Sequence, residues 1–415
     1  MAYQEGYVFH SLGDRILTGI LLALFFVMAG APRVAGGTLS VPGSAPTIKG
    51  AMLKAKPGDI ILVSCGTYNE HDIHIKSGVA LWSGTLQPDC VTIDAGGRGR
   101  ALIFADADTN TAVVGLTLTG ARVRASDADG TGGAILCRNS SPRISNCVIR
   151  NNEAHAGGGL YADAASAPVV ENCLFQHNTA MTYGGAVAWE CAEGVIRACS
   201  LKQNVALHGG GLASLDGAHA RVAGSVIVGN EAGNSGGGVY FRRSSGLVTG
   251  TVLAHNAGGL GGGAVACVES SPTLDRCTVF ANIVEFTGAA VACIASTPQL
   301  FNCILANHPS AVVVTDQEMP TLTGCNLFGN AGGDWSGLLA SQRNQRRNLS
   351  ADPRFCAPEY GNFYLNGDSD CLPANNPSGN DSIIGAHGAG CAGETGIEQS
   401  ARDVPGGFRA VQAGF

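Results

Sequence analysis

The sequence predicts an all-β fold, a right-handed parallel β-helix of about ten stacked coils, because three residue columns share one 26-residue spacing. The glycine column is Gly132, Gly158, Gly184, Gly210, Gly236, Gly262 and Gly288. The asparagine column is Asn152, Asn178, Asn204, Asn230, Asn256 and Asn282. The cysteine-rich column is Cys147, Cys173, Cys199, Ser225, Thr251, Cys277 and Cys303. A spacing that does not slip indicates that each repeat stacks on the one before it.

Short strands explain the residues between these columns. Apolar residues alternate with polar ones, as in Ile144, Ser145 and Ile149, which is the period of a half-buried strand. The asparagines follow these strands, so we expect turn residues that tolerate a left-handed backbone and bond to one another through their side-chain amides. The glycines permit positive φ and close approach of the backbone at another corner.

Both ends of a stacked core need covering. At the amino end, Thr47, Ile48, Ala51, Met52 and Ala55 have helical spacing and Pro57-Gly58 follows, which predicts an amphipathic capping helix. We expect an amino-terminal cap over 36–57, the β-helix over 58–335, an irregular carboxyl-terminal cap folded over the last coil at 336–391, and a flexible tail at 392–415.

The first 35 residues predict a signal peptide. An apolar run, Ile16 to Gly30, follows Arg15 and is too short to cross a bilayer comfortably. The expected location is therefore secreted, periplasmic or at the cell surface. An uncleaved segment of this kind is the alternative, and it is the only route by which we expect contact with a membrane.

Composition excludes several classes of protein. The formal charge is −7 without a basic cluster, so nucleic acid is not an expected partner. The 60 glycines do not recur at every third residue, which excludes collagen. The 15 cysteines form two groups: those in the repeat, including a second column at Cys137, Cys267 and Cys293, are expected to be buried thiols, whereas Cys356, Cys371 and Cys391 are expected to be oxidised.

Several segments resemble the pectin-lyase-like family of right-handed β-helix proteins. Its amino-terminal motif is matched by Thr47-Ile48, Gly58-Asp59 and Gly66-Thr67-Tyr68. The repeats resemble those of exported bacterial β-helix proteins and polymorphic outer membrane proteins, with Gly132-Gly133-Ala134-Ile135 and Phe175-Gln176-His177-Asn178 as examples. The resemblance covers residues 45 to 391 and implies the fold. The short catalytic signatures of pectate lyases, polygalacturonases and pectin esterases are not found intact, so it implies no reaction.

One outward column is the candidate catalytic site. The 26-residue spacing would place Glu190, Asp216 and Arg242 on three successive coils, with two carboxylates about 5 Å apart and an arginine for an acidic sugar. Ser214 and Tyr240 are expected to face outward beside them, and Tyr183 is a candidate for stacking on a sugar. The alternative is an exposed ladder of ion pairs with little effect on stability.

Metal and cofactor sites have little support in the sequence. Asp106, Asp108 and Asn110 begin like a Ca²⁺ loop, but Thr111 replaces the turn glycine, so the segment is expected to be a turn, with Ca²⁺ binding as the alternative. The histidines at 177 and 255 are expected to be surface residues. No other cofactor is expected.

These observations favour an exported β-helix that acts as an adhesin-like or carbohydrate-binding rod, with an extracellular polysaccharide or cell-surface glycan as its partner. The alternative is a polysaccharide lyase or glycoside hydrolase that acts on an acidic polysaccharide, with Glu190, Asp216 and Arg242 as its catalytic residues. A structural component of a surface layer is the third hypothesis. The sequence does not decide whether the protein is an enzyme.

Overall fold

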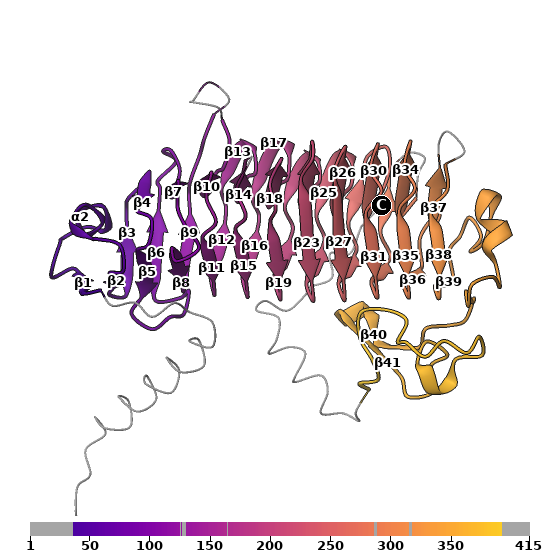
Figure 1. The fold of residues 1–415 in the computed structure, drawn as a ribbon. Coiled ribbons are helices and arrows are strands. Elements are labelled where there is room, and N and C mark those ends of the chain that lie inside the picture. The colour runs from indigo at the N-terminus through magenta and orange to yellow at the C-terminus, as the bar shows by residue number, and fades with distance from the viewer. Residues whose placement is uncertain are drawn as a thin grey trace, which may run out of the picture.

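The structure is a computed structural model that describes residues 36–391 except 125, 127–129, 164, 286–288 and 315–317. The chain winds into a rod whose coils follow one another from the amino-terminal end at the left of Figure 1 to the carboxyl-terminal end at the right. Sheet B has 11 strands, one from each described coil. The predicted parallel β-helix of about ten coils is confirmed.

Sheets A and B run along the rod and are joined by two-residue corners. Sheet A contains β1 (Thr38–Val41), β2 (Ile60–Val63), β5 (Ala80–Ser83), β8 (Ala112–Val114), β11 (Arg143–Ser145), β15 (Val169–Glu171), β19 (Val195–Arg197), β23 (His219–Ala223), β27 (Ser245–Thr249), β31 (Thr273–Asp275), β35 (Gln299–Phe301) and β38 (Thr321–Thr323). Sheet B contains β3 (Gly66–Tyr68), β6 (Val91–Asp94), β9 (Leu116–Thr119), β12 (Val148–Arg150), β16 (Leu174–Gln176), β20 (Ser200–Lys202), β24 (Val226–Val228), β28 (Val252–Ala254), β32 (Thr278–Phe280), β36 (Ile304–Ala306) and β39 (Asn326–Phe328).

Sheets C and D complete the coils. Sheet C contains β4 (Ile73–Ile75), β7 (Leu102–Ala105), β10 (Ile135–Arg138), β14 (Leu160–Ala162), β18 (Val187–Glu190), β22 (Leu212–Leu215), β26 (Val239–Arg242), β30 (Val265–Val268), β34 (Val291–Ile294) and β37 (Val312–Val314). The shorter sheet D contains β13 (Glu153–Ala156), β17 (Thr179–Tyr183), β21 (Val205–His208), β25 (Glu231–Ser235), β29 (Ala257–Gly258) and β33 (Ile283–Val284).

The corner after each central strand of sheet B holds the predicted asparagine ladder. Asn178 Nδ2 donates to Asn204 Oδ1 at 3.0 Å, and Asn204 Nδ2 donates to Asn230 Oδ1 at 2.9 Å. All six asparagines of the column are buried. The left-handed residue is the one before each asparagine, such as His177 at φ 54° and Gln203 at φ 53°. Stacked amides satisfy polar groups that would otherwise be buried without partners.

The corner between sheets A and B repeats this arrangement with cysteine. A left-handed residue such as Asn172, at φ 52°, precedes a buried cysteine such as Cys173. The Cys173 thiol donates to the backbone oxygen of Glu171 at 3.2 Å and accepts from the backbone nitrogen of Cys147 at 3.4 Å. The predicted buried thiols in this column are present.

Sheet D departs from the strict 26-residue register. Tyr183 in β17 pairs with Ala156 of the preceding coil, 27 residues earlier, and with His208 of the next, only 25 residues later. A β-bulge adds one residue to β17 and to β25, and the turn beyond sheet C removes it again. The glycines with positive φ therefore include Gly157 and Gly209 instead of the predicted Gly158 and Gly210.

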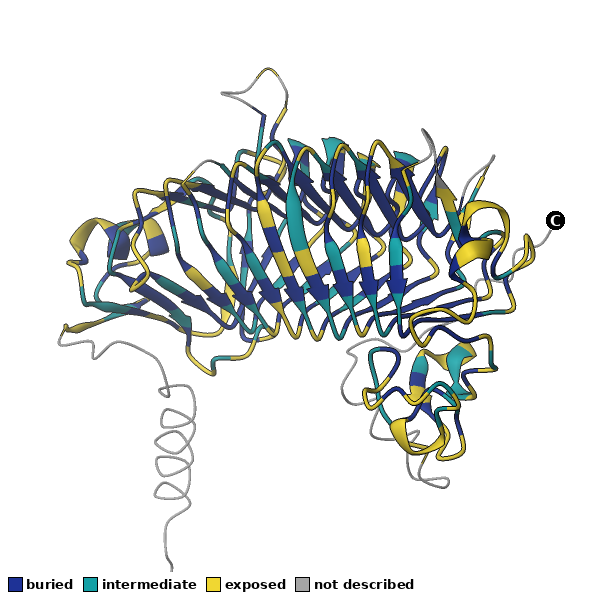
Figure 2. Cartoon of the chain, turned by 45° about the vertical axis from the view of Figure 1, so that its right-hand side comes forward, coloured by how far each residue is buried: buried dark blue, intermediate teal, exposed yellow. Residues whose placement is uncertain are grey.

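The core fills the inside of the rod along its length. Figure 2 shows dark blue, buried residues on the strands throughout the coils. The largest fully buried side chains include Trp189, Phe104, Phe175 and Phe241. They face inward together with the aliphatic columns that the alternation of the sequence predicted.

Helix α2 (Ile48–Lys54) covers the amino-terminal end, as expected. Thr47 Oγ1 accepts from the backbone nitrogen of Gly50 at 3.0 Å, which is an N-cap. The carboxylate of Glu70 accepts from the backbone nitrogens of Ile48 and Lys49 at 2.8 and 2.9 Å. Ile48, Ala51 and Met52 are buried against the first coils.

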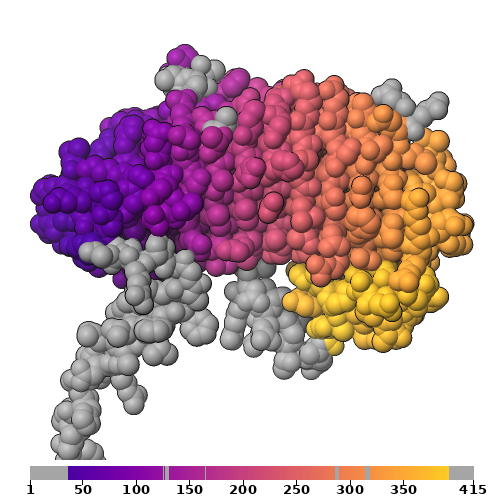
Figure 3. All heavy atoms as spheres, viewed as in Figure 1, coloured from indigo at the N-terminus to yellow at the C-terminus, as the bar shows by residue number. Residues whose placement is uncertain are grey.

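The carboxyl-terminal segment does more than cover the last coil. The 3₁₀ helix η1 (Gly337–Gln342) lies at that end, where Leu339 packs on the core. Residues 351–391 then turn back and lie along the outer face of sheet B, below the rod in Figures 1 and 3. They contain η2 (Pro358–Tyr360), η3 (Pro373–Asn375) and the antiparallel pair β40 (Phe355–Ala357) and β41 (Asn362–Leu365). The prediction that 336–391 folds over the last coil is wrong for this part, because four successive coils present an apolar outer column there: Val228, Ala254, Phe280 and Ala306.

Two disulfides are present, Cys65–Cys90 and Cys356–Cys391. The first was not predicted, because both cysteines lie before the regular repeat. The prediction that Cys371 is oxidised is wrong: it is a free thiol, fully buried between the cap and sheet B, and it accepts from Asn326 Nδ2 at 3.2 Å.

We predict that Asn230→Ala lowers the free energy of unfolding by about 2 to 4 kcal/mol, because it leaves buried donors and acceptors on both neighbouring coils without partners. Asn230 Nδ2 contacts the backbone oxygen of Leu201 and Oδ1 of Asn256, at 2.9 and 3.0 Å. Denaturant unfolding measures the change. The neighbouring exposed residue offers a control, Glu231→Ala, and a loss as large in that variant would contradict the prediction.

The cysteines give a second prediction that can be counted. Of the 11 free cysteines, only Cys191 is exposed. Native protein should therefore release about one equivalent in a thiol titration with a disulfide reagent, and Cys191→Ser should release none, because burial blocks access to the other thiols. Denatured, unreduced protein should release 11. Fast reaction of several thiols in the native state would contradict the packing of the two cysteine columns.

Candidate functional site

The candidate site lies at the corner where sheet D meets the outer face of sheet C. The bulge in β17 places Tyr183 at the end of its strand, beside His208 at the end of β21. Both side chains lie over sheet C, where Ala188 and Ala213 are small outward residues in register with Tyr240. The glycine after each strand makes the turn: Gly184 has φ 66°, and a Cβ there would lie 2.2 Å from the backbone oxygen of Val187.

Three rings form a stack at this corner. The ring centroids of Tyr183 and His208 are 5.5 Å apart with an interplanar angle of 22°. The His208 and Tyr240 centroids are 4.7 Å apart, and those of Tyr183 and Tyr240 are 6.2 Å apart. Tyr240 is buried, whereas Tyr183 and His208 are partly exposed. The stack thus presents flat apolar surface with polar edges, which suits a ligand with both characters.

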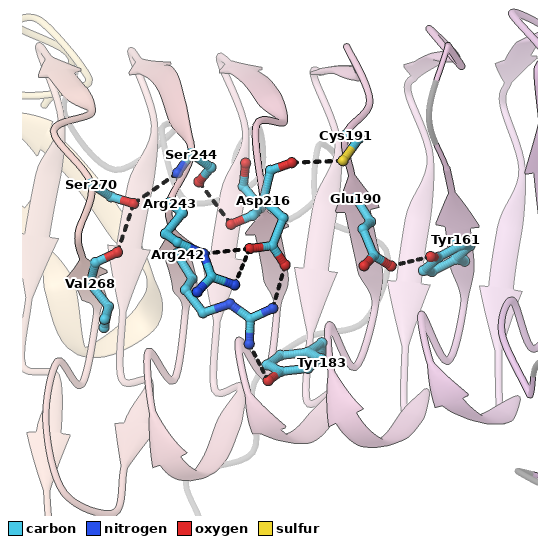
Figure 4. A network of polar contacts seen from close by, with 11 residues as sticks. Tyr161, Tyr183, Glu190, Cys191, Asp216, Arg242, Arg243, Ser244, Val268 and Ser270 are labelled. Carbon is cyan, nitrogen blue, oxygen red and sulfur yellow. Dashed lines mark hydrogen bonds and ion pairs between the residues drawn. The ribbon is translucent and has the colours of Figure 1, made fainter.

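Arginines extend the stack. Arg242, from the end of β26, lies with its Cζ atom 4.7 Å from the Tyr183 ring centroid, and its Nη1 donates to Tyr183 Oη at 2.5 Å. Its Nη2 donates to Asp216 Oδ2 at 2.5 Å, while Arg243 donates to Asp216 Oδ1 through Nε at 2.8 Å (Figure 4). Two guanidinium groups share one carboxylate, so this group of three carries one net positive charge.

The ionisation of these groups follows from their neighbours. Burial raises the pKa of Asp216, but hydrogen bonds from Arg243 and Arg242 outweigh it, and the net pKa lies below its usual range. Burial and the charge of Arg242 lower the pKa of His208. At neutral pH the site therefore holds an ionised Asp216 and a neutral imidazole, whose buried Nδ1 has no hydrogen-bond partner.

The predicted column of Glu190, Asp216 and Arg242 is wrong in its register. Leu215, not Asp216, pairs with both Glu190 and Arg242, because the bulge shifts sheet C by one residue in alternate coils. Asp216 lies one position past the end of β22, with φ 48°. Glu190 instead accepts a hydrogen bond from the Tyr161 hydroxyl (Figure 4). Asp216 and Arg242 are in contact, as expected, but through a turn.

The same shift changes the position of Ser214. It was expected to face outward, but its side chain is fully buried in the inward column between Trp189 and Phe241. It therefore does not contribute a hydroxyl group to the surface. Tyr240 does lie on the outer face and Tyr183 covers it, so two of the three predicted binding residues lie in one cluster.

Sequence reasoning missed His208, Arg243 and Tyr161. The signal that locates them is the apolar residue three positions after the first glycine of each pair. Aligning on it gives a column that is the start of each strand of sheet C: Ile135, Leu160, Val187, Leu212, Val239 and Val265. This column shifts by 25 or 27 residues in alternate coils and brings Tyr183 next to His208.

The Ca²⁺ candidates form a turn. Asp108 Oδ1 accepts from Thr111 Oγ1 at 2.9 Å, and its Oδ2 accepts from Asn110 Nδ2 at 3.0 Å. Asp106 accepts from Asn139 Nδ2 at 2.7 Å. Within the described part of the chain, no three His, Cys, Asp or Glu side chains lie close enough together to hold a metal ion. No helix of the described ranges is long and apolar enough to span a membrane, and residues 1–35, predicted to be a signal peptide, lie outside those ranges.

The arginine pair predicts a pH dependence of stability. Because the pKa of Asp216 is lower in the folded than in the unfolded chain, its ionised form stabilises the fold above about pH 4, and this stabilisation is lost as the pH falls through the folded-state pKa. Asp216→Asn should therefore reduce the free energy of unfolding by about 1 to 2 kcal/mol at neutral pH, and the difference from wild type should disappear in acid.

Denaturant unfolding at several pH values measures this difference. The exposed carboxylate of Asp89 supplies the control, Asp89→Asn, which should match wild type throughout. A constant difference between Asp216→Asn and wild type at every pH would show that the substitution acts through packing instead of charge.

Comparison with known proteins supports the fold. No curated protein matches the sequence. Among solved structures, pectate lyase Pel9A has a TM-score of 0.53 at 12% identity, over 87% of this chain and 98% of that chain. The catalytic domain of a GH87 α-1,3-glucanase in complex with nigerose has a TM-score of 0.38 at 12% identity, over 72% of this chain and 61% of that chain. A polygalacturonase from Erwinia carotovora ssp. carotovora has a TM-score of 0.32 at 13% identity, over 71% and 96%.

At these identities the likeness concerns the fold alone. The family described as "Right handed beta helix region" matches residues 103–233 and 185–345, which together span more than half of the chain. The matched residues include the asparagine ladder, the bulged strands and the Tyr183 stack. The solenoid, its handedness and the predicted pectin-lyase-like resemblance agree with this match, and the chain belongs to the right-handed β-helix family.

Proposed function

We propose that this protein is an exported β-helix that binds an extended acidic polysaccharide at its surface, as an adhesin-like or carbohydrate-binding rod. The observation that carries the proposal is the stack of Tyr183, His208 and Tyr240 with Arg242 at its edge. Flat rings fit the apolar faces of sugars, and guanidinium groups fit carboxylate or sulfate groups.

The long face of the rod supports a polymer as ligand. Parallel strands repeat at about 4.8 Å, so successive coils offer a regular row of side chains to an extended chain. Glu190 with Tyr161 lies on the coils before Asp216 and Arg242, and these polar groups follow one another along the same face (Figure 4). The solved structures of similar fold include a pectate lyase and an α-1,3-glucanase, which are proteins that act on polysaccharides.

The disulfides support export. Cys65–Cys90 and Cys356–Cys391 each join two segments at an end of the described chain. Such bonds persist in oxidising compartments, including the periplasm and the cell exterior. Together with the signal-like apolar run near the amino terminus, they favour a protein that works at or beyond the cell surface.

The ionisation of the site favours binding over hydrolysis. A glycoside hydrolase of the usual type needs one protonated carboxylic acid beside a second carboxylate. Asp216 is held ionised by two arginines, so it does not supply that proton at neutral pH. Its role in this proposal is to hold Arg242 and Arg243 in place for an acidic sugar.

A polysaccharide lyase is the second candidate, and His208 is the observation that favours it. Its imidazole is neutral at neutral pH and lies 4.7 Å, centroid to centroid, from Tyr240. A neutral imidazole near an arginine could remove a proton from the carbon next to a sugar carboxylate, whose charge the arginine would stabilise. Such a reaction leaves an unsaturated product that absorbs ultraviolet light.

The proposal predicts that the protein binds polygalacturonate and alginate more tightly than a neutral glucan, and that Arg242→Met and Tyr183→Ala each weaken binding about tenfold, because they remove a charge-assisted contact or the flat ring. Affinity electrophoresis measures this binding. Arg143 is an arginine paired with Glu171 on sheet A, so Arg143→Met is the matched control. Equal binding by all three variants, or equal retardation in neutral and acidic gels, would contradict the proposal.

The same polymers separate the two candidates. Incubation with protein should produce no ultraviolet-absorbing ends and no new reducing ends if the rod only binds. Release of unsaturated ends that is lost in His208→Ala, while binding persists, would replace the binding rod by a lyase.

A further inference from the structure

The carboxyl-terminal cap meets the rod at a change in the outer column of sheet B. This column is polar in the earlier coils, at Arg150, Gln176 and Lys202, and becomes apolar from Val228 onward. The cap lies on the apolar part: Phe355 and Phe363 pack edge to face on Phe280, with ring centroids 5.7 and 5.3 Å away. Lys202 is therefore the last polar residue before the cap begins.

A cavity of about 190 Å³ lies at this junction, between β20, β24 and β28 on one side and residues 358–364 with His387 on the other. Its volume equals that of roughly six water molecules. The walls are mostly apolar, because Val226, Val228, Val252 and Phe363 line them. It lies on sheet B, away from the Tyr183 stack on sheets C and D.

Basic groups line this apolar cavity from both sides. The Lys202 side chain lies among the rod residues and is only 6% exposed. His255 follows β28, and His387 of the cap stacks on Tyr364 with ring centroids 4.6 Å apart. Of the lining residues only Glu359 is acidic, and it is exposed. Burial lowers the pKa of Lys202, His255 and His387, so each of these cations would be stabilised by an anion brought into the cavity.

The cap is held firmly enough to keep the cavity in shape. The backbone nitrogen of Ala386 donates to Thr278 Oγ1 at 2.9 Å, and that of Gly385 donates to the backbone oxygen of Asn302 at 2.8 Å. Asn380 Nδ2 donates to Asn302 Oδ1 at 2.8 Å. These bonds fix the segment that carries His387. A preformed cavity binds a small ligand without the cost of ordering its walls.

We propose that this cavity is a binding site for a small organic carboxylate with a flat apolar body. The body would lie between the valines and Phe363, and the carboxylate would contact Lys202 and the imidazoles of His255 and His387. The site goes beyond polysaccharide binding: it uses another sheet, and its volume admits a molecule of about ten non-hydrogen atoms instead of a polymer.

Benzoate and its neutral counterpart benzamide test this proposal, because they share a ring and differ in charge. Isothermal titration calorimetry or ligand-observed NMR with the full chain should give a submillimolar dissociation constant for benzoate and binding at least tenfold weaker for benzamide. Lys202→Met keeps the length of the side chain and should weaken benzoate binding at least tenfold. Lys49 is an exposed lysine of α2, and Lys49→Met should bind like wild type.

The other results also decide. Should Lys202→Met fail to fold, His387→Ala replaces it and should weaken benzoate binding severalfold. Wild-type affinity in Lys202→Met, equal affinity for benzoate and benzamide, or no saturable binding of benzoate would overturn the site. Polygalacturonate binding by Lys202→Met should be unchanged, so failure of this proposal is distinguishable from failure of the polysaccharide proposal.

Discussion

The buried asparagine ladder is the interaction on which the rest of the structure depends. Each amide of the column joins its coil to the next, so two neighbouring coils cannot shift against one another without leaving buried polar groups unsatisfied. Left-handed residues before the asparagines and before the cysteines keep both corners of sheet B to two residues. This edge of the rod therefore keeps a strict 26-residue period.

Variation is confined to the other side of the coil. Sheet D tolerates an extra residue in β17 and β25 because a bulge absorbs it, and the turn beyond sheet C compensates before the next ladder asparagine. The bulge turns Tyr183 over the outer face of sheet C, where alanines leave room for rings. A fixed edge and a variable edge thus divide the rod into a part that holds the fold and a part that can carry binding residues.

The sequence predicted the architecture well, because the columns that define it lie at the strict edge. The ladder from Asn152 to Asn282, the inward aliphatic columns and the helix at Ile48 follow from local rules of spacing and capping. The candidate site was predicted only in part, since a one-residue gain that is cancelled within the same coil does not disturb the asparagine period. Ser214 was therefore placed on the wrong face and His208 was missed. The position of the cap depends on contacts between distant segments, which spacing alone does not contain.

The central claim is that the bulged coils bring Tyr183, His208, Tyr240 and Arg242 together as a surface for an acidic sugar chain. A crystal structure of the protein with an oligogalacturonate bound tests this most directly. The account predicts a sugar ring on Tyr183, a carboxylate within hydrogen-bond distance of the Arg242 guanidinium, and Tyr183 in register with His208. An oligosaccharide bound on sheet A or B, or a register that pairs Asp216 with Glu190, would contradict it.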